Sequence, residues 1–254
     1  MASRRERTAR LTRKRTEFTA RTLHNSSASS MKIYLDTADT RQWRLPPGCP
    51  PVQGVTTNPA LVQQAGLPVT LETYLRLLKQ AGQAGLRELM LQLPRPDVAE
   101  AHEWLAQLLP AAGQARVRLT IKLPCHPEWE PVIQEVHAWG LPLLLTGLAN
   151  PMQLLWARSQ NAHFVAPYLG RLQADGRDIW ALVSACVALQ RDGVQLLAAS
   201  IKEADVLTRL IAHQAHAATL RPDFAARLAT DPVTDAAMAQ FDREVEQSLR
   251  HPLG

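Results

Sequence analysis

The stretch RVRLTIKLPCHPEW, residues 116–129, shows a pattern of apolar and polar positions that recurs along this chain. Apolar residues at 117, 119 and 121 alternate with polar ones, and Pro124 ends the alternation. A period of two is typical of a β-strand, because successive side chains point to opposite faces of a sheet. The pattern therefore predicts a strand that carries Lys122 to its carboxyl end.

Eight short runs of this kind follow one another, separated by longer segments with helical texture. Their starts are mostly about 20 to 35 residues apart, the length that a strand, a loop and a crossover helix consume. The predicted strands are KIYLDT (32–37), VQGVTTN (52–58), ELMLQLP (88–94), VRLTIKLP (117–124), LPLLLTGL (141–148), HFVAPYL (163–169), VQLLAASIK (194–202) and AATLRP (217–222).

Several intervening segments predict helices. Residues 70–81 and 202–214 place apolar side chains at helical spacing, and 150–160 begins with Asn150 as N-cap and Pro151 as first helical residue. A last amphipathic segment spans about 224–249, and Asp231–Pro232 is the place where it would break.

Alternation of strands and helices defines the expected fold class as α/β. Eight strands, each with a crossover, predict a single-domain (β/α)8 barrel over residues 31–254. The alternative is a doubly wound open sheet, which normally carries a glycine-rich turn after its first strand. The sequence DTADTR at 36–41 is not such a turn, so the barrel is favoured.

Polar side chains gather at the predicted strand ends, where barrel enzymes place their catalytic groups. Each could have a purely structural role: Asp36 as a helix cap, Asn58 in a turn, Tyr168 as core filler, Lys202 as a surface charge. Their joint placement at one end of the fold favours a site. The candidates are Asp36, Thr56, Thr57, Asn58, Gln92, Lys122, Thr146, Tyr168, Arg171, Ser200 and Lys202.

Lys122 suggests the chemistry of that site. A lysine inside a partly desolvated barrel is disfavoured in its charged form, and a neutral amine attacks a carbonyl to form a Schiff base. Such chemistry needs a carboxylate to move protons (Asp36), an amide for substrate hydroxyls (Asn58) and a positioned water, for which Gln92, Thr146 and Tyr168 are candidates. Arg171, Ser200 and Lys202 would bind a phosphate.

Charge is distributed unevenly along the chain. The formal net charge is +5, but residues 1–30 alone carry +6, which leaves −1 for the rest. This basic extension could be a nucleic-acid or anionic-surface arm, a transit peptide, or a disordered extension, the last including the case of a start codon assigned too early upstream of Met31. We favour the disordered extension.

Composition narrows the classes of protein to which this chain can belong. No apolar run reaches the roughly 20 residues of a membrane helix. Cys49, Cys125 and Cys186 form no metal spacing and fit free thiols in a reducing compartment. The closest histidines, His213 and His216, have no nearby carboxylate partner, so we expect no metal.

Five motifs resemble the transaldolase family, and most of all its short branch, the fructose-6-phosphate aldolases. They are YLDT (34–37), GVTTNP (54–59), IKLP (121–124), VAPYLGR (165–171) and AASIK (198–202). The resemblance begins at Met31 and runs essentially to the C-terminus, whereas the first thirty residues have no counterpart.

The resemblance implies a (β/α)8 barrel with a Schiff-base lysine on strand four, no metal and no cofactor. It implies roles for Lys122 (Schiff base), Asp36 (proton transfer), Asn58 (substrate hydroxyls), Thr146 (the strand-five threonine), and Arg171, Ser200 and Lys202 (phosphate). Gln92 and Tyr168 match the aldolase branch, since transaldolases carry glutamate and phenylalanine there; Gly170 looks more like the transaldolase form. The resemblance also implies a large ring-shaped homo-oligomer, such as a decamer, in which the C-terminal helix reaches a neighbour.

Three functions follow as expectations. The first is an aldolase that joins dihydroxyacetone, or a similar hydroxyketone, to glyceraldehyde 3-phosphate and gives fructose 6-phosphate. The second is a transaldolase that moves the same three-carbon unit between sugar phosphates. The third is a non-catalytic barrel whose basic tail binds anions. We expect a cytoplasmic homo-oligomer with sugar-phosphate ligands, no membrane partner and no nucleic-acid partner.

Overall fold

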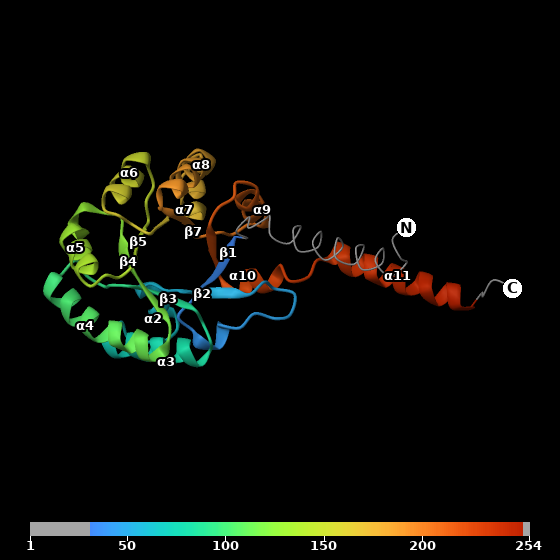
Figure 1. The fold of residues 1–254 in the computed structure, drawn as a ribbon. Helices are drawn as coiled ribbons and strands as arrows, with labels where there is room; N and C mark the ends of the chain where they lie inside the picture. The colour runs from blue at the N-terminus through green and yellow to red at the C-terminus, as the bar shows by residue number, and fades with distance from the viewer. Residues whose placement is uncertain (1–30, 251–254) are drawn as a thin grey trace, which may run out of the picture. The chain divides into compact units, whose positions relative to one another are not determined.

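The predicted strands close into a barrel (Figure 1). A computed structural model describes residues 31–250; our expectations for the basic extension, residues 1–30, lie outside that part. Neighbouring strands are parallel and follow chain order, and the last pairs with the first. The strands are β1 (Lys32–Asp36), β2 (Val52–Thr56), β3 (Glu88–Gln92), β4 (Arg118–Pro124), β5 (Leu143–Thr146), β6 (Phe164–Ala166), β7 (Gln195–Ala198) and β8 (Ala217–Leu220). The (β/α)8 prediction is confirmed.

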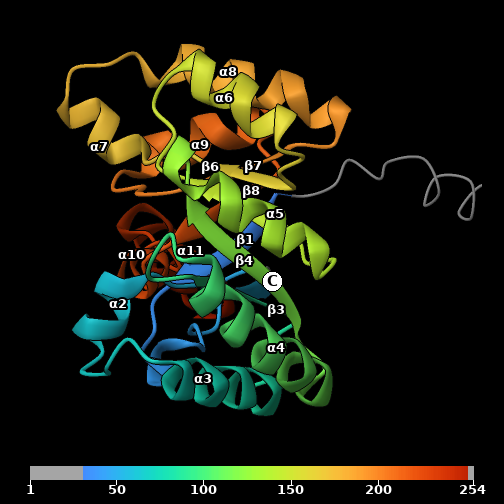
Figure 2. The same ribbon diagram turned by 90° about the vertical axis from the view of Figure 1, so that its left-hand side faces the viewer.

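Helices lie around the strands in both views of the molecule, except the last one, which extends away from the barrel in Figure 1 (Figures 1 and 2). They are α2 (Pro59–Gln64), α3 (Leu71–Gln83), α4 (Val98–Ala115), α5 (Glu130–Ala138), α6 (Pro151–Ser159), α7 (Leu169–Ala174), α8 (Ile179–Leu189), α9 (Ala204–Ala212), α10 (Pro222–Arg227) and α11 (Pro232–Arg250). Residues 31–250 also contain three short 3-10 helices: η1 (Thr40–Gln42), η2 (Pro127–Trp129) and η3 (Gln190–Asp192).

The helix signals in the sequence act as expected. Asn150 caps α6, and its side chain accepts a hydrogen bond from the Gln153 amide. The predicted break before the last helix is confirmed, because α10 ends at Arg227 and α11 begins at Pro232. Among residues 31–250, no helix is long and apolar enough to cross a membrane.

Two buried layers hold the barrel together. One lies between the sheet and the helices and includes Leu35, Leu89 and Ile121. The other fills the barrel interior, with Tyr34, Met90, Leu144, Phe164, Ala166, Leu197, Ala199 and Ala217. Successive residues of a strand contribute alternately to these two layers. The position of one interior residue therefore fixes which others on its strand point inward.

A buried carboxylate occupies the barrel near the amino ends of β3 and β4. Glu88 accepts hydrogen bonds from the Tyr34 hydroxyl (2.7 Å) and the Thr120 hydroxyl (2.6 Å), and Arg118 lies 3.7 Å away. Burial, and then the Glu88 charge, raises the pKa of Tyr34 well above its ordinary value. Gly54 leaves room for this strand, since a Cβ there would lie 2.2 Å from the Glu88 carbonyl oxygen. This end of the barrel is therefore closed and structural.

Candidate active site

Four predicted site residues, at or just beyond the ends of strands, share the inward-facing parity of the barrel core. Asp36, Gln92, Thr146 and Tyr168 each follow an interior residue of the same run by two positions: Tyr34, Met90, Leu144 and Ala166. Since side chains alternate, these four and Lys122 belong to the interior face near the carboxyl ends. That end is where barrel proteins carry their functional groups.

Lys122 is almost completely buried, with 4% of its surface exposed. Strand pairing sets it beside Gln92 of β3, and its Nζ lies 5.9 Å from the centre of the Tyr168 ring. Lysines are rarely buried without a partner, because the charged amine loses its hydration. A ring face at this distance provides only weak compensation. The fold therefore places a buried amine beside Gln92 at the carboxyl end of β4.

Three buried side-chain oxygens at the carboxyl ends of the strands have no hydrogen-bond partner in the described chain. They are Oγ1 of Thr57, Oε1 of Gln92 and Oγ1 of Thr146. A buried polar atom left unpaired costs about 1–3 kcal/mol. Such a set is expected where a substrate or a positioned water supplies the missing partner.

Asp36 is oriented by a chain of hydroxyl groups. The Thr56 hydroxyl donates to its Oδ1 at 2.9 Å and lies 2.8 Å from the Thr219 hydroxyl. Because Thr56 has one hydroxyl hydrogen and gives it to Asp36, Thr219 must be the donor to Thr56. Sequence reasoning missed Thr219, although a polar residue between Ala218 and Leu220 near the end of the last strand was a usable signal.

Asn58 has a structural duty as well as its predicted one. It is the N-cap of α2, and its side-chain oxygen accepts a hydrogen bond from the Leu61 amide at 3.0 Å. The cap fixes the side chain at the end of β2. Its amide hydrogens are the part that would serve a substrate hydroxyl.

The predicted phosphate residues meet where the chain ends of β6 and β7 run side by side. Tyr168 bridges to Ala199, and the Gly170 amide donates to the Ser200 carbonyl at 2.9 Å. Gly170 permits this approach, because a Cβ there would lie 2.4 Å from that carbonyl oxygen and 3.3 Å from the Lys202 side chain. Ser200 has a positive φ of 61°, a strained conformation of the kind found at functional positions.

Arg171 stacks on Tyr168. Its guanidinium carbon lies 4.6 Å from the ring centre, so Tyr168 contacts both Arg171 and, at longer range, Lys122. A cavity of about 460 Å³ opens beside this pair, lined also by Gly147 and Leu172. The contact joins the predicted phosphate-binding residues to the lysine through a single ring.

Cys125 follows the lysine strand closely but is a poor nucleophile. Its thiol is buried and donates to the Gln153 carbonyl oxygen at 3.6 Å. Burial raises the pKa of Cys125 to about 11, so the thiol is protonated near neutral pH. The Cys125 thiol therefore does not compete with Lys122 as a nucleophile.

The structure thus brings the candidates together in two groups. The first group lies at the ends of β3 to β6 and consists of Lys122, Gln92, Thr146, Tyr168 and Arg171. The second group lies at the ends of β1 and β2 and consists of Asp36, Thr56 and Asn58. No hydrogen bond joins Lys122 to Asp36 in the described range, so proton transfer between them would pass through substrate or water. Within residues 31–250, no group of three histidine, cysteine or acidic side chains is placed to hold a metal ion.

The fold and site define a (β/α)8-barrel protein with a buried lysine at the carboxyl end of β4. The chain belongs to the Transaldolase/Fructose-6-phosphate aldolase family, whose model matches residues 97–252, more than half of its length. Membership in that family makes the protein an enzyme of the aldolase type.

Individual relatives agree with this assignment. A protein named "Probable transaldolase" from Halalkalibacterium halodurans is 27% identical over 214 residues, covering 83% of this chain and 97% of the relative. Another of that name, from Herpetosiphon aurantiacus, is 27% identical over 222 residues, covering 83% and 93%. A solved structure of an enolase from Sargasso Sea environmental DNA shares only the fold, with a TM-score of 0.54, 12% identity, and coverage of 76% and 53%.

Proposed function

We propose that this protein is a Schiff-base aldolase that reversibly joins dihydroxyacetone, or a similar hydroxyketone, to glyceraldehyde 3-phosphate and gives fructose 6-phosphate. The observation that carries the proposal is the burial of Lys122 beside oxygens of Gln92 and Thr146 that lack protein partners. An amine held out of water is a nucleophile for a ketone carbonyl.

The reaction begins when Lys122 Nζ attacks the ketone carbon and water leaves, which forms an iminium ion. A proton leaves the adjacent hydroxymethyl carbon, and its electron pair forms the enamine. That carbon then attacks the aldehyde carbon, and the aldehyde oxygen takes up a proton. Water finally hydrolyses the iminium and releases the ketose and the amine. Asp36 would shuttle protons, helped by a water at Gln92, Thr146 and Tyr168.

The phosphate of the aldehyde would bind at Arg171, Ser200 and Lys202. Support comes from the close packing of the β6 and β7 ends, where Gly170 lies against Ser200 and Lys202. Arginine and hydroxyl donors suit phosphate oxygens, and two cations offset its charge. Thr56, Thr57 and Asn58 would bind hydroxyls of the ketone from the β2 side.

A second candidate is transfer of the three-carbon unit between sugar phosphates. The names of the relatives and the glycine at position 170 favour it, whereas Gln92 and Tyr168 favour the aldolase. An amide and a phenol beside the iminium would let the free ketone leave. A carboxylate in that place, with no phenol, would retain the covalent intermediate until an acceptor arrives.

The deciding experiment follows fructose 6-phosphate with and without an acceptor aldose phosphate. The proposal expects glyceraldehyde 3-phosphate to be released at a steady rate without acceptor. A rate that requires acceptor would instead establish the transaldolase.

We also propose that the chain works as a cytoplasmic homo-oligomer. Support comes from α11, none of whose residues is buried although Met238, Phe241, Val245 and Leu249 are apolar. These four lie at spacings of three and four residues and form one stripe. Such an uncovered stripe suits a second copy of the chain.

A further inference from the structure

We propose that a polar cavity beside Asp36 is a second substrate subsite, which takes the uncharged, hydroxylated end of a donor ketone longer than three carbons. The cavity has a volume of about 310 Å³. This inference rests on the proposed aldol reaction and names a class of donor for it: neutral hydroxyketones extended on the side away from the new bond.

The cavity opens at the same end of the barrel as Lys122. Its walls come from the end of β1, from η1, from α2 and from the start of α10. Residues that line it include Asp36, Thr37, Gln42, Gln64, Ala65 and Arg221. In the order of the barrel it covers the β8–β1–β2 side, whereas Arg171 and Ser200 follow β6 and β7.

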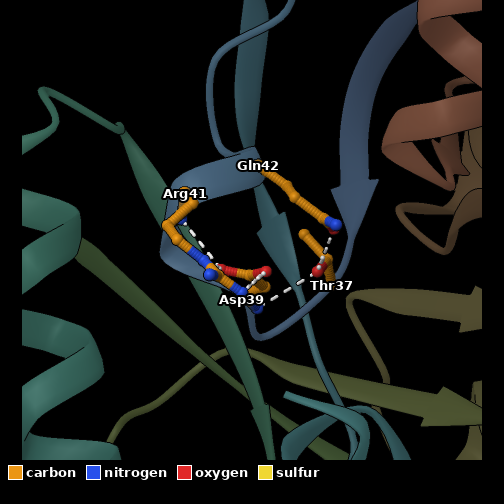
Figure 3. A network of polar contacts seen from close by, with 4 residues as sticks. All are labelled: Thr37, Asp39, Arg41 and Gln42. Atoms are coloured by element: carbon orange, nitrogen blue, oxygen red, sulfur yellow. Dashed lines mark hydrogen bonds and ion pairs between the residues drawn. The ribbon is translucent and has the colours of Figure 1, made fainter.

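The wall formed by η1 is held rigid by its own hydrogen bonds (Figure 3). Asp39 receives both Nε and Nη2 of Arg41, at 2.9 and 2.8 Å, and its backbone amide donates to Thr37 at 3.1 Å. The Thr37 hydroxyl in turn donates to Oε1 of Gln42 at 3.0 Å. In the described chain no protein group binds Nε2 of Gln42, so its two hydrogens can donate to a ligand.

All but one of the carboxylates around the cavity are paired with an arginine. The Arg41 hydrogen bond holds the pKa of Asp39 below its ordinary value, and Arg221 does the same for Asp223. Asp36 has Thr56 rather than a cation as its partner. With one uncompensated carboxylate and no free cation among the described residues that line it, the cavity suits hydroxyl donors and disfavours an anion.

The length of an extended ketose places its unphosphorylated end in the cavity beside Asp36. With the phosphate held over β6 and β7 and the imine carbon at Lys122, the chain beyond the imine must continue toward another part of the mouth. The cavity beside Asp36 offers room there. Its volume equals several times the roughly 30 Å³ share of a water molecule, enough for a two-carbon diol.

A four-carbon ketose, erythrulose, is the direct probe. Its carbonyl would form the iminium with Lys122, and water would leave. The hydroxymethyl carbon on one side would lose a proton and bond to the aldehyde carbon of glyceraldehyde 3-phosphate, while the diol on the other side occupies the cavity. After hydrolysis the product is a linear seven-carbon ketose phosphate whose carbonyl is at C3; no oxidant or other reactant is needed.

The experiment compares donors and variants. Product structure is determined by NMR, and kcat/KM is measured for erythrulose and for dihydroxyacetone. Ala65→Phe would fill the cavity, so we expect the erythrulose-to-dihydroxyacetone ratio to fall on the order of tenfold. Ala84→Phe is the matched control, because both alanines end a helix and precede a glycine with positive φ. It should leave the ratio unchanged.

A second variant keeps the test valid if Ala65→Phe does not fold. Gln42 is exposed, and Gln42→Leu removes its donors at nearly constant size. Loss of one or two hydrogen bonds should lower the ratio roughly 3- to 10-fold.

Several outcomes would overturn the inference while the aldolase stands: dihydroxyacetone reacts but erythrulose does not, the product is branched, or neither variant changes the ratio. Preference for erythrulose 4-phosphate over erythrulose would also overturn it, since the cavity would then accept an anion. If neither ketone reacts, the proposed function fails and the inference fails with it.

Discussion

Lys122 gains its proposed reactivity from its surroundings. It shares the barrel interior with apolar side chains, and its Nζ faces the Tyr168 ring at 5.9 Å. Arg171 contacts the same ring at 4.6 Å. Tyr168 therefore connects the two residues to which we assign imine formation and phosphate binding, and changes at either position should be read together.

Replacement of Gln92 and Tyr168 tests how the intermediate partitions. We predict that Gln92→Glu combined with Tyr168→Phe lowers cleavage of fructose 6-phosphate and raises transfer to an acceptor. General acid–base contributions of this kind are about 10²–10⁴-fold, so the change should be large. Cleavage at the parent rate would remove the main support for aldolase over transaldolase.

Replacement of Arg171 tests the phosphate site. Arg171→Ala should raise KM for glyceraldehyde 3-phosphate far more than for glyceraldehyde, because a charge-assisted hydrogen bond contributes about 1.5–3 kcal/mol. Arg158→Ala, which removes an exposed arginine paired with Asp192, is the control. Equal losses on both aldehydes would show that Arg171 has a structural role.

His216 gives the fold a dependence on pH. Burial, and then the nearby Lys32 ammonium, lowers its pKa to about 4. An unfolded histidine has a pKa of about 6.5, so between these values the unfolded chain binds a proton that the folded chain does not. Stability should therefore fall as pH drops from about 6.5 to 4.

His216→Asn should remove part of that loss, on the order of 1–2 kcal/mol after allowance for partial exposure. Urea unfolding at pH 7 and pH 4.5 measures the difference. A His216→Asn slope equal to that of the parent would contradict the assignment.

Strand ends show where sequence patterns stop being informative. Apolar runs predicted strands to 169 and 202, but β6 ends at Ala166 and β7 at Ala198. Pro167 offers no backbone donor, and the positive φ of Ser200 turns the chain. Tyr168, Ser200 and Lys202 therefore lie beyond the strands on which we expected them.

α11 carries the prediction about assembly. Met238→Asp with Phe241→Asp should lower the oligomer mass in sedimentation, because the charges interrupt the apolar stripe. Ala236→Asp, on the opposite face of the same helix, is the control and should keep the parental mass. If all three proteins have the same mass, α11 takes no part in assembly.

At the scale of the whole molecule, the features that depend on local sequence patterns were predictable. The alternation of apolar and polar residues, as around Lys122, and helix caps such as Asn150 predicted the eight strands, the barrel and a lysine that points into its interior. The Thr219–Thr56–Asp36 relay was not predictable, because it needs β8 to close on β1 and place hydroxyls from residues 163 positions apart within 2.8 Å. The cavity beside Asp36 has the same origin, since its walls come from three distant segments.

We propose that Lys122 forms the covalent intermediate. The most direct test of this proposal is borohydride reduction of the full-length protein in the presence of fructose 6-phosphate or dihydroxyacetone, followed by mass spectrometry of peptides. We predict one stable three-carbon adduct on Lys122, and none on Lys122→Met with its fold intact by circular dichroism. An adduct on another lysine, such as Lys202, or no adduct under turnover conditions, would contradict the account.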